Sequence, residues 1–224
     1  MNHLFKLLTL IVITQLASVW ASAQTYTTLE FNSPTATSST EGYSPEATVD
    51  GLLNTGWSSA GSGASITWDI DIGPNQILPA LENNQHYVYR IILSWTGNWR
   101  NDLQSYQLST QTATDTAFSL ATNFESLTTS GGNTLSFDDA GIITSTQPSP
   151  FSGNNGHTLR LAIDEPIESL RLTALTQGWE TQPFILTEAS GIVHVMTVPE
   201  PSTYALLLGL VACMAVAYKK RINR

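Results

Sequence analysis

The sequence has little cysteine and little charge. Its single cysteine, Cys213, leaves no pair for an intramolecular disulfide and no set of thiolates for a structural zinc ion. Charged residues make up 12% of the 224 residues, whereas hydrophobic residues make up 42%. This composition excludes a charge-rich disordered chain and a helical bundle rich in Ala, Glu, Lys and Leu. Stability must therefore come from a packed apolar core.

Basic residues are also scarce. Nine Lys and Arg against 18 Asp and Glu give a net charge of −9, the wrong sign for neutralising phosphates, so nucleic acid is a poor candidate partner. Between residues 24 and 197 the excess of acidic residues is larger, because this range contains four Arg and 17 acidic residues, which give a net charge of −13. This acidity favours the binding of cations and disfavours anionic glycans, unless an ion bridges them.

The first 23 residues have the order of a signal peptide. Lys6 precedes the largely apolar run from Leu7 to Trp20, and Ala21, Ser22 and Ala23 supply the small residues of a cleavage site. The alternative is a buried N-terminal helix. The observed order favours export, and we expect cleavage after Ala23.

Residues 198–224 have three parts, which are a short Pro-rich motif, an uncharged stretch over 203–218, and a basic end. Sixteen residues at about 1.5 Å each cover roughly 24 Å as a helix, slightly less than a hydrocarbon core of ~30 Å. The basic end should stay in the cytoplasm, which places the preceding chain on the far side of the membrane. We expect a transmembrane segment at 203–218. The basic residues are Lys219, Lys220, Arg221 and Arg224.

The motif at the start of this tail is formed by Val198, Pro199, Glu200 and Pro201. With the apolar stretch and basic end that follow, it resembles the PEP-CTERM sorting signal of Gram-negative bacteria that make exopolysaccharide. The resemblance implies recognition by an exosortase, a membrane transpeptidase, and delivery to the cell surface or extracellular matrix after transient anchoring in the inner membrane. A plain C-terminal membrane anchor is the alternative, since the apolar span would be the same.

Residues 24–197 read as one domain made of strands. Ser65–Ile72 alternates between apolar and polar residues without exception, and His86–Trp95 repeats the pattern with a partly apolar second face. We expect an all-β, antiparallel sandwich, with no amphipathic helix. The segment 113–156 reads as a long excursion with weak strands around Thr134–Phe137 and Gly141–Thr144. Further strands are predicted at Ser105–Thr110, His157–Ile163, Ser169–Ala174 and Gly191–Met196.

A series of short motifs runs through Thr35–Val195. An Ala-Ser-Ser-like opening at Ala36–Ser39 is followed by an Asp-Gly turn at Asp50, a Trp-Ser-Ser at Trp57 and an Asp-Ile-Gly strand end at Asp71. This series is similar to the discoidin, or coagulation factor C-type, domain of the galactose-binding-like superfamily. The resemblance implies an eight-stranded jelly roll with ligand-binding loops at one end. Other matching segments are Glu41–Ala47, Arg90–Leu93, Tyr106–Ser109, Leu170–Thr173, Gly178–Trp179 and Leu186–Glu188.

The same resemblance implies a Ca²⁺ site at the Asp50–Thr55 turn. Hard oxygen ligands in an acidic domain suit calcium. Leu52 departs from the family, which often has a second acidic residue there. The alternative is a tight Asp-Gly turn capped by its own side chain. The implied ligands are the side chains of Asp50, Asn54, Thr55 and Glu188 and the backbone carbonyl of Val49.

The segment Trp95–Asp102 combines an aromatic side chain, a guanidinium and amides between two strands. Sugars are bound by flat aromatic rings together with a few planar polar groups. The alternative is a turn in which the Trp packs on the sheet and the Arg pairs with Asp102. Trp57 and Trp68 are expected in the core. The candidate ligand-binding residues are Trp99, Arg100, Asn101 and Asn98, with Trp179 and Tyr43 as additional candidates.

The sequence gives no support to an enzyme. His86, His157 and His194 are isolated, and neither a His-Glu-x-x-His motif nor a Gly-x-Ser-x-Gly elbow is present. Acidic pairs such as Asp138-Asp139 and Asp164-Glu165 are expected in solvated turns. We therefore expect an exported, surface-sorted module that binds carbohydrate, such as exopolysaccharide, without turnover. The alternative is a structural matrix or adhesion protein that has the fold but no glycan site.

Overall fold

The computed structural model describes residues 25–59, 62–95, 103–130, 134–146, 156–178 and 183–197, together with Gly209. These residues form eleven strands, and every strand pairing is antiparallel. The predicted all-β, antiparallel class is confirmed. The strands are β1 (Thr27–Ala36), β2 (Ser65–Ile72), β3 (Gln85–Trp95), β4 (Leu103–Thr112), β5 (Ser119–Leu120), β6 (Phe124–Thr129), β7 (Leu135–Phe137), β8 (Ile142–Ser145), β9 (Gly156–Ile163), β10 (Ile167–Gly178) and β11 (Leu186–Thr197).

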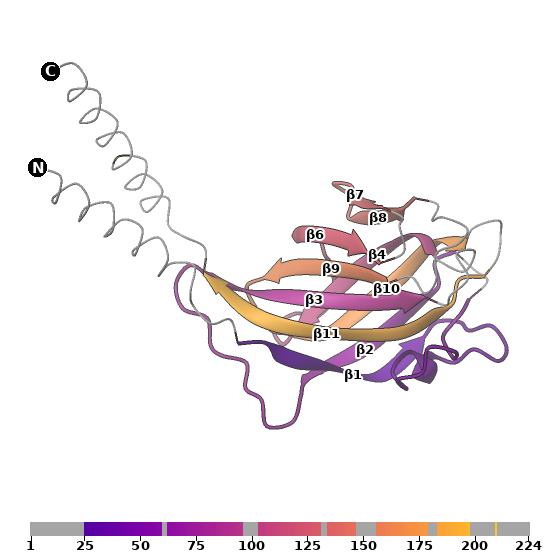
Figure 1. Cartoon of the computed structure of the whole chain (residues 1–224), viewed down its shortest axis with the longest axis horizontal. Coiled ribbons are helices and arrows are strands. Elements are labelled where there is room, and N and C mark those ends of the chain that lie inside the picture. The colour runs from indigo at the N-terminus through magenta and orange to yellow at the C-terminus, as the bar shows by residue number, and fades with distance from the viewer. Residues whose placement is uncertain are drawn as a thin grey trace, which may run out of the picture.

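The strands form one hydrogen-bonded sheet that folds over on itself. The strand order is β6-β9-β3-β11-β1-β2-β10-β4-β8-β7, with β5 paired to β4. Strand β1 makes the corner, because its first residues pair with β11 and the rest pair with β2. The pairing of β1 with β2 shifts register between Asn32 and Thr35, and Ser33 there has a φ of 46°. Figure 1 shows the layer of β9, β3 and β11 in front of β4, β10 and β2.

The core lies between the two layers and follows the predicted alternation. Ile66, Trp68 and Ile70 of β2 are buried, whereas Asp69 and Asp71 between and after them are exposed. Trp57, Trp68 and Trp95 are fully buried, as expected for large aromatic side chains in a domain without disulfides. The indole of Trp68 donates to Oγ1 of Thr48 over 2.9 Å.

A buried histidine connects the two layers. Tyr106 of β4 and His157 of β9 stack with an interplanar angle of 13°, and the Tyr106 hydroxyl lies 3.0 Å from Nδ1 of His157. Burial lowers the pKa of His157 to about 3, so the ring is neutral. This isolated histidine is part of the core.

The excursion over 113–156 is more ordered than the sequence predicts. The strands predicted around Thr134–Phe137 and Gly141–Thr144 are present as β7 and β8, and the described residues also contain β5 and β6, which were not predicted. Phe124 of β6 and Phe137 of β7 lie with ring centroids 5.3 Å apart, so the two ends of the strand order approach each other. Within the described part of 25–197, the only helical segment is the 3₁₀ helix η1 (Pro45–Thr48).

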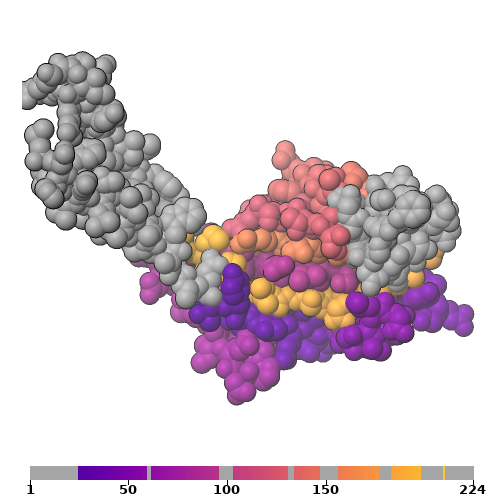
Figure 2. Space-filling model, in the orientation of Figure 1, coloured from indigo at the N-terminus to yellow at the C-terminus, as the bar shows by residue number. Residues whose placement is uncertain are grey.

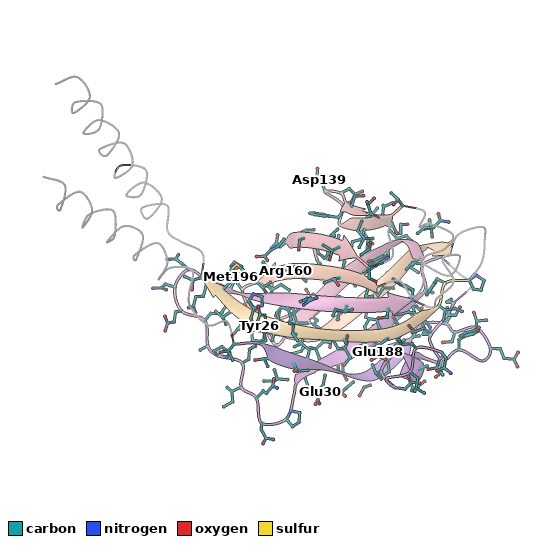
Figure 3. The ribbon with its side chains drawn as sticks, in the orientation of Figure 1. Tyr26, Glu30, Asp139, Arg160, Glu188 and Met196 are labelled. Carbon is teal, nitrogen blue, oxygen red and sulfur yellow. The ribbon has the colours of Figure 1, made fainter. Side chains whose placement is uncertain are left out.

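The sandwich has two ends. At one, which we call the loop end, Leu186 of β11 pairs with Trp95 of β3, and Gly178 of β10 pairs with Leu103 of β4. At the other, the terminal end, β11 ends at Thr197, which pairs with Gln85. In Figure 3, Glu188 lies toward the right, and Tyr26 and Met196 lie at the left.

The assignments of the two terminal segments stay predictions. The signal peptide 1–23 and the motif Val198–Pro201 lie outside the described residues, as does segment 203–218 apart from Gly209. In the described part of the chain, no helix is long and apolar enough to cross a membrane.

Candidate functional site

The turn from Asp50 to Thr55 is closed by its own aspartate. One carboxylate oxygen of Asp50 accepts the backbone amide of Leu52 over 2.8 Å, and the other accepts the hydroxyl of Thr55 over 2.7 Å. Gly51 has a φ of 74°, in the left-handed region that glycine adopts without strain. The self-capped Asp-Gly turn, which is the alternative to the predicted calcium site, is therefore present.

Glu188 joins this turn from β11. The Gly51 amide donates to Oε2 of Glu188 over 3.2 Å, across 137 positions of the sequence. Burial raises the pKa of Glu188, the Gly51 hydrogen bond opposes this, and the Asp50 carboxylate raises it further. In the part of the chain that the structure describes, neither carboxylate has an ion pair with a basic side chain. Two acidic groups thus face each other without a cationic partner.

The sheet positions Glu188 through close packing beneath the turn. Trp57 and Leu186 form an isolated bridge, with two backbone hydrogen bonds of 2.9 Å between them. A Cβ atom on Gly56 would lie 2.6 Å from the Leu186 carbonyl oxygen, so only glycine allows this approach. β11 shifts register against β3 between Leu186 and Glu188.

An open hollow of about 660 Å³ lies beside the turn. Tyr43 forms part of its wall and is half-buried, and η1 supplies Glu46 and Ala47. Asp50 and Asn54 line the same hollow, so the turn borders the hollow and also contacts Glu188. The full lining is Gly42, Tyr43, Ser44, Glu46, Ala47, Asp50, Asn54, Thr55 and Gly56.

The structure brings together part of the predicted calcium-ligand set. Asp50, Thr55 and Glu188 lie within one hydrogen-bonded cluster, and exposed Asn54 lies beside it. The Val49 amide donates to the Glu46 carbonyl oxygen and ends η1. Nowhere in the described ranges do three or more His, Cys, Asp or Glu side chains form a group that could hold a metal ion. Backbone and hydroxyl oxygens would have to complete the site.

Most of the predicted sugar-binding residues lie outside the described residues. These are Asn98, Trp99, Arg100, Asn101 and Trp179, whereas Tyr43 is described and lines the hollow. The strand ends next to these residues are described. Trp95 ends β3 and Leu103 begins β4, on either side of residues 98–101, and Gly178 ends β10 directly before Trp179.

Two residues that line the hollow are not among the site residues predicted from the sequence. Glu46 lies in the first turn of η1, and Gly56 provides the close approach to Leu186. The Tyr-Ser-Pro-Glu run at 43–46 was a signal for the first, since Pro is favoured at the start of a helix. Gly56 has no local sequence pattern that marks it, because a side chain there is excluded by Leu186 of β11, which is distant in the sequence.

The acidic pairs Asp138-Asp139 and Asp164-Glu165 each contain a carboxylate that accepts hydrogen bonds from neighbouring turn or strand residues. Oδ1 of Asp138 accepts the backbone amides of Ala140 and Ile142, at 3.0 and 2.9 Å. Oε2 of Glu165 accepts the hydroxyls of Thr112 and Thr114, at 3.0 and 2.6 Å.

No family model and no curated protein matches the chain. Solved structures similar to it include a truncated AlyQ with family 32 carbohydrate-binding module (CBM32) and alginate lyase domains, at 16% identity and a TM-score of 0.47; the match covers 79% of this chain and 36% of that one. A family 32 module of C. perfringens NanJ in complex with galactose has 14% identity and a TM-score of 0.44, covering 75% and 99%. The F5/8 type C domain of a Bacteroides fragilis protein has 11% identity and a TM-score of 0.42, covering 73% and 96%. All three TM-scores lie below 0.5, so we base the function on the residues of this chain.

Proposed function

We propose that the protein is a non-catalytic carbohydrate-binding module that uses the loop end of its sandwich. The observation that carries the proposal is the open hollow formed by Tyr43, η1 and the Asp50–Thr55 turn. It combines an aromatic side chain with amide, carboxylate and hydroxyl groups, the mixture that sugar binding requires.

The candidate residues outside the described ranges adjoin strand ends at the same end of the sandwich. Trp99, Arg100 and Asn101 fall between Trp95 and Leu103, and Trp179 directly follows Gly178. In the proposed complex Trp99 stacks on the sugar ring, while the Arg and Asn side chains, with Asn98, bind its hydroxyl groups. Trp179 extends the aromatic surface.

We include Ca²⁺ as a structural ion at the turn. Asp50 and Glu188 provide two carboxylates without a basic partner in the described residues, and the Thr55 hydroxyl, the Asn54 amide and the Val49 carbonyl provide neutral oxygens. This donor set suits calcium. The bound ion would supply positive charge between the carboxylates and hold the turn against β11.

We also include export and sorting in the proposal. The signal peptide 1–23 would direct export, and the membrane segment 203–218 would hold the protein transiently at the inner membrane. The Val198–Pro201 motif would then direct an exosortase to pass it to the cell surface or extracellular matrix, where exopolysaccharide is its ligand. The supporting observation is the order of motif, apolar stretch and basic end in the sequence.

The binding test is a tryptophan-fluorescence titration of the full chain in detergent with galactose and with neutral galactan oligosaccharides. We expect a saturable change that Trp99→Ala and Tyr43→Ala weaken at least about tenfold, the cost of losing a central aromatic contact. Ile77→Ser, at the terminal end, is the matched control and should bind as the wild type. Equal responses from all four proteins would contradict the proposed site.

A further inference from the structure

Ile77 is the most exposed large hydrophobic side chain in the described part of the chain, at 85%. It lies in loop 73–84, which joins β2 to β3 at the terminal end (Figure 1). Figure 2 shows the β2–β3 region projecting from the lower left of the surface, near the end where β11 stops. Tyr26, 54% exposed, belongs to the same end.

The loop holds Ile77 in this outward position. On one side, the Gln76 side chain accepts a backbone amide of β1 over 2.7 Å. On the other, the Tyr87 hydroxyl donates to the Pro79 carbonyl over 2.7 Å. Leu78 is partly buried against the core, so the loop buries the residue next to Ile77 while leaving Ile77 itself in solvent.

The loop also lies beside the point where the chain leaves the domain. It ends at Gln85, which pairs with Thr197 of β11, and the Gln85 side-chain amide lies 3.5 Å from the Thr197 hydroxyl. The uncharged stretch begins six positions later, at Thr203. Six extended residues span at most about 20 Å, so a membrane-inserted tail keeps this end of the domain within that distance of the lipid.

The loop composition indicates what kind of surface it meets. Glu82 is its only charged residue, and it contains no Lys or Arg. It therefore has no basic group to attract anionic headgroups, whereas Ile77 offers apolar area that gains from leaving water. Tethering by the tail raises the effective concentration of the lipid surface, so a small contact is sufficient.

We propose that loop 73–84 docks on the zwitterionic lipid surface of the membrane that holds the tail, with Ile77 entering the interface. The inference rests on the membrane anchoring included in the proposed function. Docking would turn the loop end, with the hollow and Glu188, away from the membrane (Figure 3).

The test uses the full chain carrying Cys213→Ser, reconstituted into phosphatidylcholine vesicles. An environment-sensitive fluorophore is attached at Ile77→Cys or, as the matched control, at Leu53→Cys, an exposed apolar position (51%) in the turn at the opposite end. We expect emission at 77 to shift to the blue and to be quenched by spin-labelled lipids, unchanged in 0.5 M salt, whereas the label at 53 remains in water.

Each other outcome overturns a defined part of the account. A protein that floats with the vesicles but gives the same emission at both sites contradicts docking and leaves anchoring intact. A blue shift at 77 without quenching by lipid indicates contact with a second protein copy and also contradicts docking. A protein that does not float with the vesicles overturns the anchoring itself, and docking with it.

Discussion

The backbone amide of Gly51 donates a hydrogen bond to Oε2 of Glu188 over 3.2 Å. This contact joins the turn after η1 to β11, the strand of the front layer that adjoins β1. It also brings the Glu188 carboxylate close enough to Asp50 for the negative charge of Asp50 to raise its pKa. We therefore expect the stability of the turn and β11 to depend on the protonation of Glu188 and, if calcium binds as proposed, on calcium.

Calcium is expected to stabilise the wild-type protein and to have little effect on Glu188→Gln. Glutamine keeps an acceptor for the Gly51 amide but removes one of the two carboxylate charges. At a free calcium concentration 100 times the Kd, the gain in unfolding free energy is about 2.7 kcal/mol, read as a rise in Tm over the EDTA-treated protein. Glu165→Gln, which changes a carboxylate bonded to two threonines, is the control and should respond as wild type. An equal rise in Tm for Glu188→Gln would contradict the site.

In EDTA the raised pKa of Glu188 predicts a second effect. Because the folded protein binds the Glu188 proton more tightly than the unfolded chain, this group adds stability as the pH falls from neutral toward the ordinary value of 4.5. Wild type should be less stable than Glu188→Gln at pH 7, and the difference should narrow by pH 5. Urea unfolding at both pH values measures it, and a difference that is constant with pH would disagree with the account.

The buried histidine predicts a stability change of the opposite sign. His157 has a pKa of about 3 in the folded protein and an ordinary value of 6.5 when unfolded. Below pH 6.5 the unfolded chain therefore binds more protons, and stability is lost as the pH falls, by at most about 1.4 kcal/mol per pH unit. His157→Gln should lack this component between pH 6.5 and 4.5. NMR of the imidazole checks the cause, since a ring that titrates near pH 6 in the folded protein would contradict it.

Gly56→Ala should damage the floor of the hollow. The added Cβ would lie 2.6 Å from the Leu186 carbonyl oxygen and 2.9 Å from Cγ2 of Ile185. We expect a loss of about 1–3 kcal/mol in unfolding free energy, as for other overpacked sites. Gly73→Ala is the control, because the nearest atoms there lie 3.6 Å away. Equal stability of the two variants, measured by urea unfolding, would show that the Trp57–Leu186 bridge is not tightly packed.

The sequence predicts the strands whose alternation is unbroken. Ser65–Ile72 is found with the predicted bounds because Ile66, Trp68 and Ile70 face the core in regular alternation, while Ile72 at its end is exposed. β1 was not predicted because Ser33, which has a positive φ, and Pro34 interrupt its alternation of apolar and polar residues. β6 was not predicted because its pairing with β9 shifts register between Phe124 and Ser126, which breaks the alternation at that point.

The site is predicted only in part for a related reason. The Asp-Gly turn has a local signature, and the resemblance to discoidin domains pointed to Glu188 in a distant strand. The close packing at Gly56 has no local signature, since it depends on how β11 crosses beneath the turn. The placement of Trp99, Arg100 and Asn101 remains a prediction, because they lie outside the described residues.

The most direct test of glycan binding at the loop end is a glycan array probed with the full chain, wild type beside Trp99→Ala, in calcium-containing buffer. The net charge of −13 between residues 24 and 197 disfavours acidic sugars. The account predicts signals on neutral glycans that are lost in Trp99→Ala and retained in Ile77→Ser. No signal from a folded wild-type protein, or the same signal from wild type and Trp99→Ala, would contradict it, and the first result would favour a structural matrix protein.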